Sequence, residues 1–172
     1  MNNHMKIHKK IGIFGGAFDP PHNGHVNLVN SVMRELALDK VIVIPTGTSP
    51  HKAASATAFS DRLKMAGLAF PDYEISDIES RPGKSYMIDT LRELCEIYPD
   101  DEFYLLIGSD MMDSFDTWKD HEEILKLCRV VPTSRSIVPV SSTEIRADLE
   151  KHKHLLPEAV YDYIKQRGLY EL

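Results

Sequence analysis

Short apolar runs alternate with longer amphipathic segments along most of this 172-residue chain. A β-branched run that ends at Gly or Pro is typical of a buried strand, and an apolar stripe at helical spacing is typical of an amphipathic helix. Strands that alternate with helices predict βαβ units, and hence an α/β fold with a doubly wound parallel sheet. The predicted strands are 10–15, 40–45, 73–79, part of 102–110, 129–132 and 136–140, and the predicted helices are 24–37, 60–70, 86–97, 120–128, 142–150 and 157–167.

The length predicts a single domain over residues 1–172. We expect residues 1–9 to be a poorly ordered start, and we leave their polar sequence out of the fold. Ser60 is expected to cap the helix that follows it, and Gly168 is expected to end the last helix.

The composition is that of a globular protein with an acidic balance: 42% hydrophobic residues, 27% charged residues and a formal net charge of −6. Binding to nucleic acid or to anionic membranes needs a broad basic surface, so this balance argues against both partners. No apolar run approaches the roughly 18 residues of a membrane span. Cys95 and Cys128 form no ligand-like pair, which favours a reduced protein of the cytoplasm. Whether the chain forms a homo-oligomer stays open.

The unusual stretches of the sequence each follow a predicted strand. In open α/β sheets, ligands bind beyond the carboxyl ends of the strands. We therefore expect four segments, residues 15–25, 46–52, 108–118 and 141–146, to converge on one crevice.

The first of these stretches, GGAFDPPHNGH, begins at Gly15 and is the densest in chemistry. Gly15 and Gly16 allow a sharp turn and a close approach to a ligand. His22 and His25 are three residues apart at the start of the first helix, where unpaired amides favour a phosphate, and Gly24 leaves room for a flat group. Three other interpretations stay open: a simple glycine turn, a metal site without an obvious third ligand, and a solvated histidine pair.

A second anion site is expected at Ser141. Ser141 and Glu144 have the spacing of a capping box, so a helix should begin near Ser142 and carry Arg146 one turn further on. Arginine can hold phosphate oxygens through two hydrogen bonds. The alternative is an ordinary capped helix with a surface arginine.

Together the two motifs resemble the signatures of the nucleotidyltransferase superfamily, His-x-Gly-His and Ser-Ser-Thr followed by Arg three positions after the Thr. Within that superfamily, four more stretches are similar to the bacterial nicotinate-mononucleotide adenylyltransferases: SPHK, SYMIDTL, GSDMMDSFDTWKDHEEIL and LPEAVYDYIKQRGLY. The similarity extends from Lys10 over nearly the whole chain. It implies a Rossmann-like fold of the nucleotidyltransferase type.

The resemblance also implies a reaction: ATP and nicotinate mononucleotide give deamido-NAD and pyrophosphate, with Mg²⁺ arriving on ATP and no metal ligands from the protein. The implied catalytic residues are His22, His25, Lys52 and Arg146. Trp118 would stack on the pyridine ring, and Asp110 would either bind a ribose hydroxyl or cap a helix. Residues expected to bind ATP are Gly15, Gly16, Ala17, Phe18, His22, Gly24, His25, Gly108, Asp110, Ser141, Ser142, Thr143 and Arg146, and those expected to bind the acceptor are Gly16, Lys52, Tyr86, Asp89, Thr90 and Trp118.

Three departures from the family pattern fall on the acceptor side. Met87 stands where the family usually has a threonine, His121 where many members have an aromatic residue, and the segment 131–141 is shorter than usual. Other functions therefore stay open: adenylyl or cytidylyl transfer to nicotinamide mononucleotide, phosphopantetheine or another phosphorylated acceptor, and nucleotide sensing without catalysis. Aminoacyl-tRNA ligases share the histidine motif, but this chain is short and lacks a basic patch.

Overall fold

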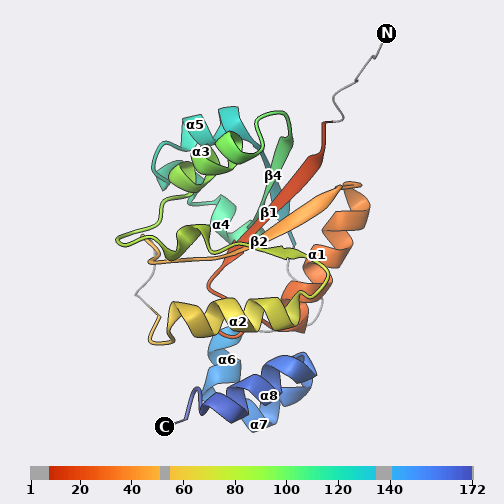
Figure 1. Ribbon diagram of the computed structural model, residues 1–172, viewed down its shortest axis with the longest axis vertical. Coiled ribbons are helices and arrows are strands. Elements are labelled where there is room, and N and C mark those ends of the chain that lie inside the picture. Colours follow the sequence, from red (N-terminus) through yellow and green to blue (C-terminus); the bar gives the residue numbers. More distant parts are fainter. Residues whose placement is uncertain (1–7, 51–54, 135–140, 172) are drawn as a thin grey trace.

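The computed structural model describes residues 8–50, 55–134 and 141–171. Its centre is a five-stranded, fully parallel sheet in the order β3-β2-β1-β4-β5, which confirms the predicted α/β class (Figure 1). The strands are β1 (Lys10–Gly16), β2 (Lys40–Pro45), β3 (Glu74–Ile75), β4 (Glu102–Gly108) and β5 (Arg129–Thr133). The order reverses at β1, which therefore marks the switch point where an open α/β sheet binds its ligands.

Alternate residues of the strands point to opposite faces, and each face has its own core. Val41 and Val43 of β2 pack with α1 (Asn23–Glu35), α2 (Phe59–Ala69) and α8 (Glu158–Arg167), whereas Ile42 and Ile44 pack with α3 (Met87–Ile97) and α5 (His121–Leu127). Helices therefore cover both faces of the sheet, as a doubly wound fold requires.

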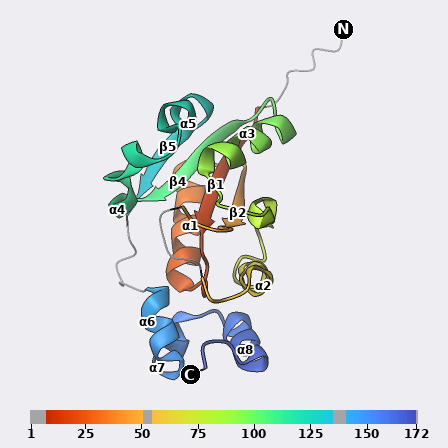
Figure 2. The same cartoon turned by 90° about the vertical axis from the view of Figure 1, so that its left-hand side faces the viewer.

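Short elements complete the chain: α4 (Ser109–Met112), α6 (Ser142–Ala147), α7 (Leu149–His152), and the 3-10 turns η1 (Ile78–Ser80), η2 (Phe115–Thr117) and η3 (Lys153–Leu155). Figures 1 and 2 both place α6, α7 and α8 together at one end of the molecule. Gly168 ends α8 in the left-handed conformation, as predicted. Among the described helices, none is long and apolar enough to cross a membrane.

Three sequence predictions about these elements were wrong. Ser60 does not cap α2, because the N-cap position is Ala58 and no side chain bonds there. The strand expected over 73–79 is only two residues long, since it pairs at the sheet edge and the chain then turns into η1. The helix expected over 142–150 breaks at Asp148, whose side chain accepts a hydrogen bond from the amide of Lys151 and starts α7. The strand expected over 136–140 lies outside the described residues.

Candidate active site

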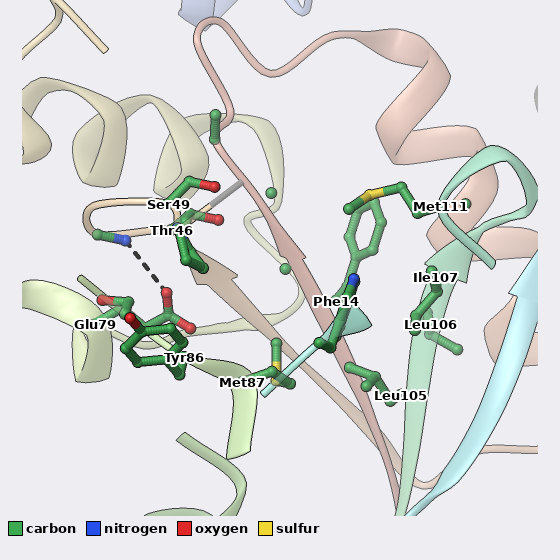
Figure 3. Close-up of a pocket in the computed structure, with 18 of the residues that line it drawn as sticks. Phe14, Thr46, Ser49, Glu79, Tyr86, Met87, Leu105, Leu106, Ile107 and Met111 are labelled. Carbon is green, nitrogen blue, oxygen red and sulfur yellow. Dashed lines mark hydrogen bonds between the residues drawn. The ribbon is translucent and has the colours of Figure 1, made fainter. Parts of the chain in front are cut away.

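A cavity of about 220 Å³ opens at the carboxyl ends of β1, β2 and β4. Figure 3 shows Glu79 and Tyr86 on one side of it, and Phe14, Leu106 and Met111 on the other. Of the residues predicted to bind ligands, those that line it are Gly15, Gly16, Ala17, Tyr86, Gly108 and Trp118. The cavity thus lies where the topology places a ligand site.

Gly15 and Gly16 do not form the expected turn. Both belong to β1 and pair with Ile44 and Pro45 of β2. The chain turns two residues later, at Phe18, which has a positive φ of 51°. The phenyl ring of Phe18 is buried, so only its backbone is placed to meet a ligand.

The two histidines form a reciprocal cap at the start of α1. The amide of His25 donates to Nδ1 of His22 (3.4 Å), and the amide of His22 donates to Nδ1 of His25 (3.1 Å). The rings stack with their centroids 3.7 Å apart. Because each Nδ1 accepts a hydrogen bond, the network assigns the ring proton to Nε2, which leaves an N–H on each ring for a ligand.

Both imidazoles are neutral at physiological pH. Burial lowers the pKa of His22 from 6.5 to about 4. Burial, followed by the nearby His22, lowers the pKa of His25 to about 3. The pair therefore offers two fixed neutral donors, which suit an anion whose charge grows during a reaction.

The second motif meets the first, as predicted. Ser141 caps α6 by accepting from the amide of Glu144 at 3.1 Å. The hydroxyl of Ser142 donates to the carbonyl of Pro20 (2.7 Å), and Nη1 of Arg146 donates to the carbonyl of Asp19 (2.8 Å). Two segments more than 120 residues apart are thus joined beside the histidines.

Arg146 is oriented but still open to solvent. Its Nη2 lies 3.4 Å from the hydroxyl of Thr143, its Nη1 lies 4.0 Å from Oδ2 of Asp19, and its side chain is 36% exposed. Its contacts tie the start of α6 to the loop before His22.

Trp118 and Tyr86, both expected to bind the acceptor, line the cavity. The Trp118 indole packs at 52° against the ring of Phe115, with centroids 5.3 Å apart, and is partly exposed. The ammonium of Lys119 lies 4.5 Å from the centre of the Tyr86 ring. Met87 also lines the cavity, so an apolar side chain occupies the position of the family's threonine.

Two residues expected to bind the acceptor do not line the cavity. Thr90 is fully buried; its hydroxyl donates to Oε2 of Glu79 (3.1 Å) and accepts from Arg81 (2.7 Å). Asp89 lies half exposed, 3.9 Å from Arg92. Thr90 is therefore placed to hold Glu79 and not to touch a ligand.

The remaining predicted residues lie around this centre. Gly24 is in the first turn of α1. Asp110 is in the first turn of α4 and is not its N-cap, which is Gly108. Lys52 lies outside the described residues.

Sequence reasoning missed Arg62 and Glu79, which line the cavity although both are only 4% exposed. Nη1 of Arg62 donates to the carbonyls of Ala17 (3.0 Å) and Thr46 (2.7 Å), and so ties the segments after β1 and β2 together. Burial lowers the pKa of its guanidinium. A signal existed: Arg62 falls at helical spacing with the buried Met65 and other apolar residues of α2.

Glu79 supports the segment after β2. One of its oxygens accepts from the amide of Gly47 at 3.3 Å, and the other accepts from Thr90. Burial raises the pKa of this carboxyl, and the hydrogen bonds and nearby arginines act against that rise. No sequence pattern pointed to it, because its contacts depend on how η1 is placed.

Fold and site define a nucleotidyltransferase, and the comparisons agree. The cytidylyltransferase-like family model matches residues 13–148. A protein of Oceanobacillus iheyensis named "Probable nicotinate-nucleotide adenylyltransferase" is 35% identical over 94% of this chain and 97% of its own, and one of Geobacillus thermodenitrificans with the same name is 38% identical over 94% and 86%. This chain belongs to the nicotinate-nucleotide adenylyltransferase family.

A solved structure extends the likeness to the whole fold. The nicotinic acid mononucleotide adenylyltransferase of Plasmodium falciparum complexed with NaAD superimposes with a TM-score of 0.77, at 22% identity, over 95% of this chain and 98% of that one. At this identity the match carries the fold alone.

Proposed function

We propose that this protein transfers the adenylyl group of ATP to nicotinate mononucleotide, giving deamido-NAD and releasing pyrophosphate. The family membership supports the reaction. The main supporting observation is the pair of hydrogen bonds between the two anion motifs. Through them, Ser142 and Arg146 bind the loop that leads into His22 and His25. Donors for a chain of phosphates thereby lie together beside a cavity that Trp118 lines.

In this proposal a phosphate oxygen of the acceptor attacks the α-phosphorus of ATP in line. A bond forms between that oxygen and phosphorus, and the bond from phosphorus to the oxygen bridging to the β-phosphate breaks, so that pyrophosphate leaves. The attacking group is already an anion, so neither a covalent enzyme intermediate nor a general base is needed. Catalysis then rests on positioning and charge stabilisation.

The two imidazoles act at the reacting phosphorus. The Nε2–H groups of His22 and His25 donate to the α-phosphate oxygens, and they gain strength as negative charge develops there. Their fixed tautomers mean that no proton has to move before the reaction. Ser141, Ser142, Thr143 and Arg146 hold the β- and γ-phosphates as they become the leaving group.

The acceptor occupies the cavity. Its pyridine ring stacks on Trp118, while Gly16 and Tyr86 line the same space. We place Lys52 over the phosphates and Asp110 at a ribose hydroxyl. The acceptor phosphate then lies between Trp118 and the histidines, which is where it has to be to attack the α-phosphorus in line.

Mg²⁺ enters with ATP in this proposal. Among the residues that the structure describes, no group of three or more His, Cys, Asp or Glu side chains could hold a metal ion. ATP phosphates and water are the expected ligands, because Mg²⁺ keeps much of its water shell. We place the reaction in the cytoplasm, in keeping with Cys95 and Cys128, which are both free thiols.

Pyrophosphate release from ATP tests the proposal, with nicotinate mononucleotide, nicotinamide mononucleotide and phosphopantetheine offered in turn. We expect rapid release with nicotinate mononucleotide. Release only with phosphopantetheine would change the acceptor. ATP binding without release for any acceptor would make the protein a nucleotide sensor.

A further inference from the structure

A buried carboxylate stands behind Arg146, and the mechanism above does not use it. Asp19 is 7% exposed and lies in the loop before His22. Its Oδ2 accepts from the hydroxyl of Ser55 at 2.6 Å, and its Oδ1 accepts from the hydroxyl of Tyr170 at 2.5 Å. Both oxygens are thus engaged by neutral donors from distant parts of the chain.

Arg146 makes only a long ion pair with this carboxylate, at 4.0 Å, and no direct hydrogen bond to it. Arginine and carboxylate groups prefer two parallel hydrogen bonds of roughly 2.7–2.9 Å. Here Nη1 of Arg146 bonds to the backbone carbonyl of Asp19, and its distance to Oδ2 is 4.0 Å. The guanidinium is thus held by the backbone carbonyl, and its contact with the carboxylate is longer than a hydrogen bond.

The geometry points to Tyr170 as a positioning residue: its hydroxyl holds the Asp19 carboxylate away from Arg146, so that the guanidinium stays available for the triphosphate of ATP. This inference rests on the proposed function, in which Arg146 binds the leaving phosphates.

Without Tyr170, the Asp19 carboxylate would have a physical reason to pair directly with Arg146. Without the Tyr170 hydroxyl, Oδ1 of Asp19 would be buried and unsatisfied, which is costly. Arg146, which is bonded to the carbonyl of the same residue and lies 4.0 Å from Oδ2, the other carboxylate oxygen, is a cation within reach of a carboxylate that turns. Arg62 is also near, but its Nη1 and Nε atoms bond to the carbonyls of Ala17, Thr46 and Thr57.

The backbone around Tyr170 is shaped for this contact. Tyr170 has a φ of 62°, a left-handed conformation that a tyrosine rarely adopts, directly after the left-handed Gly168 that ends α8. Such a conformation persists only where surrounding contacts enforce it. Burial would raise the pKa of Asp19, but hydrogen bonds from Ser55, Tyr170 and Thr57 and the charge of Arg146 bring it below its ordinary value. The carboxylate is therefore charged when ATP binds.

The test compares Tyr170→Phe with Tyr163→Phe in the full chain. Tyr163 is a matched control, because its hydroxyl also ties the C-terminal segment to a buried aspartate, Asp61, at 2.7 Å. The arginine bonded to Asp61 is Arg167, not Arg146. In Tyr170→Phe we expect the KM for ATP to rise roughly tenfold, as for one lost charge-assisted hydrogen bond. AMP binding and the KM for the acceptor should not change.

A double-mutant cycle shows whether Tyr170 acts through the charge of Asp19. In an Asp19→Asn background, Tyr170→Phe should cause little further rise in the KM for ATP, because a neutral amide attracts the guanidinium much more weakly than a carboxylate does. An equal rise in both backgrounds, an equal rise in Tyr163→Phe, or an unchanged KM in Tyr170→Phe would each overturn the inference. Pyrophosphate release by the unmodified protein, measured first, keeps a failure of the proposed reaction separate from a failure of this role.

Discussion

Gly47 is the position where the shape of the cavity depends most directly on one missing atom. A Cβ added there would lie 2.1 Å from the carbonyl oxygen of Glu79 and 2.6 Å from the hydroxyl oxygen of Ser85. Such contacts are not tolerated, so in Gly47→Ala the segment after β2 must shift by about 1 Å to restore van der Waals distance. That shift breaks the bond from the Gly47 amide to Glu79.

Two terms give the expected cost of Gly47→Ala. Overpacking costs about 1–3 kcal/mol, and a lost hydrogen bond to a buried carboxylate adds about 1–3 kcal/mol. We expect urea unfolding to show a loss of about 2–6 kcal/mol in the free energy of unfolding, the sum of the two terms. Acceptor affinity should fall as well, because Thr46, Gly47 and Ser49 line the cavity.

Gly67→Ala is the matched control. Gly67 lies inside α2, and an added Cβ would meet nothing within 4 Å. Alanine is the better helix former, so this change should stabilise the protein by about 0.5–1 kcal/mol. If Gly47→Ala unfolds within about 0.5 kcal/mol of the unmodified protein, a surface-like change, the close approach to Glu79 is refuted.

Three further predictions concern the ligand groups. Arg146→Lys should raise the KM for ATP and leave AMP binding nearly unchanged, because the forked geometry is lost while the charge is kept; equal losses for ATP and AMP in binding titrations would contradict the assignment. Trp118→Ala should weaken acceptor binding by roughly 1–3 kcal/mol, with ATP binding unchanged and partial recovery in Trp118→Phe; a large drop in melting temperature at unchanged acceptor affinity would instead make the indole part of the core. Below pH 6.5 the histidines of the unfolded chain become protonated, whereas folded His22 and His25 stay neutral down to pH about 4 and about 3. The free energy of unfolding should therefore fall as the pH drops through this window, by about 3 kcal/mol for His22 alone. A flat pH profile in urea unfolding would argue against the burial of the two rings.

The sequence was sufficient to predict features that depend on neighbouring residues. The β-branched run of β2, the cap at Ser141 and the stop at Gly168 each depend on residues next to one another, and the structure has all three. The two anion motifs also meet, as predicted; the strand at 136–140 from which that prediction was argued lies outside the described residues.

Prediction failed where a residue's role depends on distant partners. Thr90 lies one position from the apolar Leu91 on α3, and only the placement of η1 decides that its hydroxyl holds Glu79. β3 pairs with β2 over two residues only, because the chain then turns into η1. Arg62 carried a detectable signal, a charge on an apolar helix face. Tyr170 ends the stretch LPEAVYDYIKQRGLY, but no sequence pattern shows its bond to Asp19, which lies 151 residues away.

Transfer of label from ATP tests the central claim most directly. The purified protein is given ATP labelled at the α-phosphorus together with nicotinate mononucleotide, and the products are separated for the unmodified protein and for His25→Ala. Our account predicts label in deamido-NAD, and a turnover lower by a factor on the order of 10² to 10³ in His25→Ala, since a preorganised donor to the transition state is lost, with ATP affinity changed much less. Label that appears only in AMP, or a His25→Ala variant that turns over at nearly the normal rate, would contradict it.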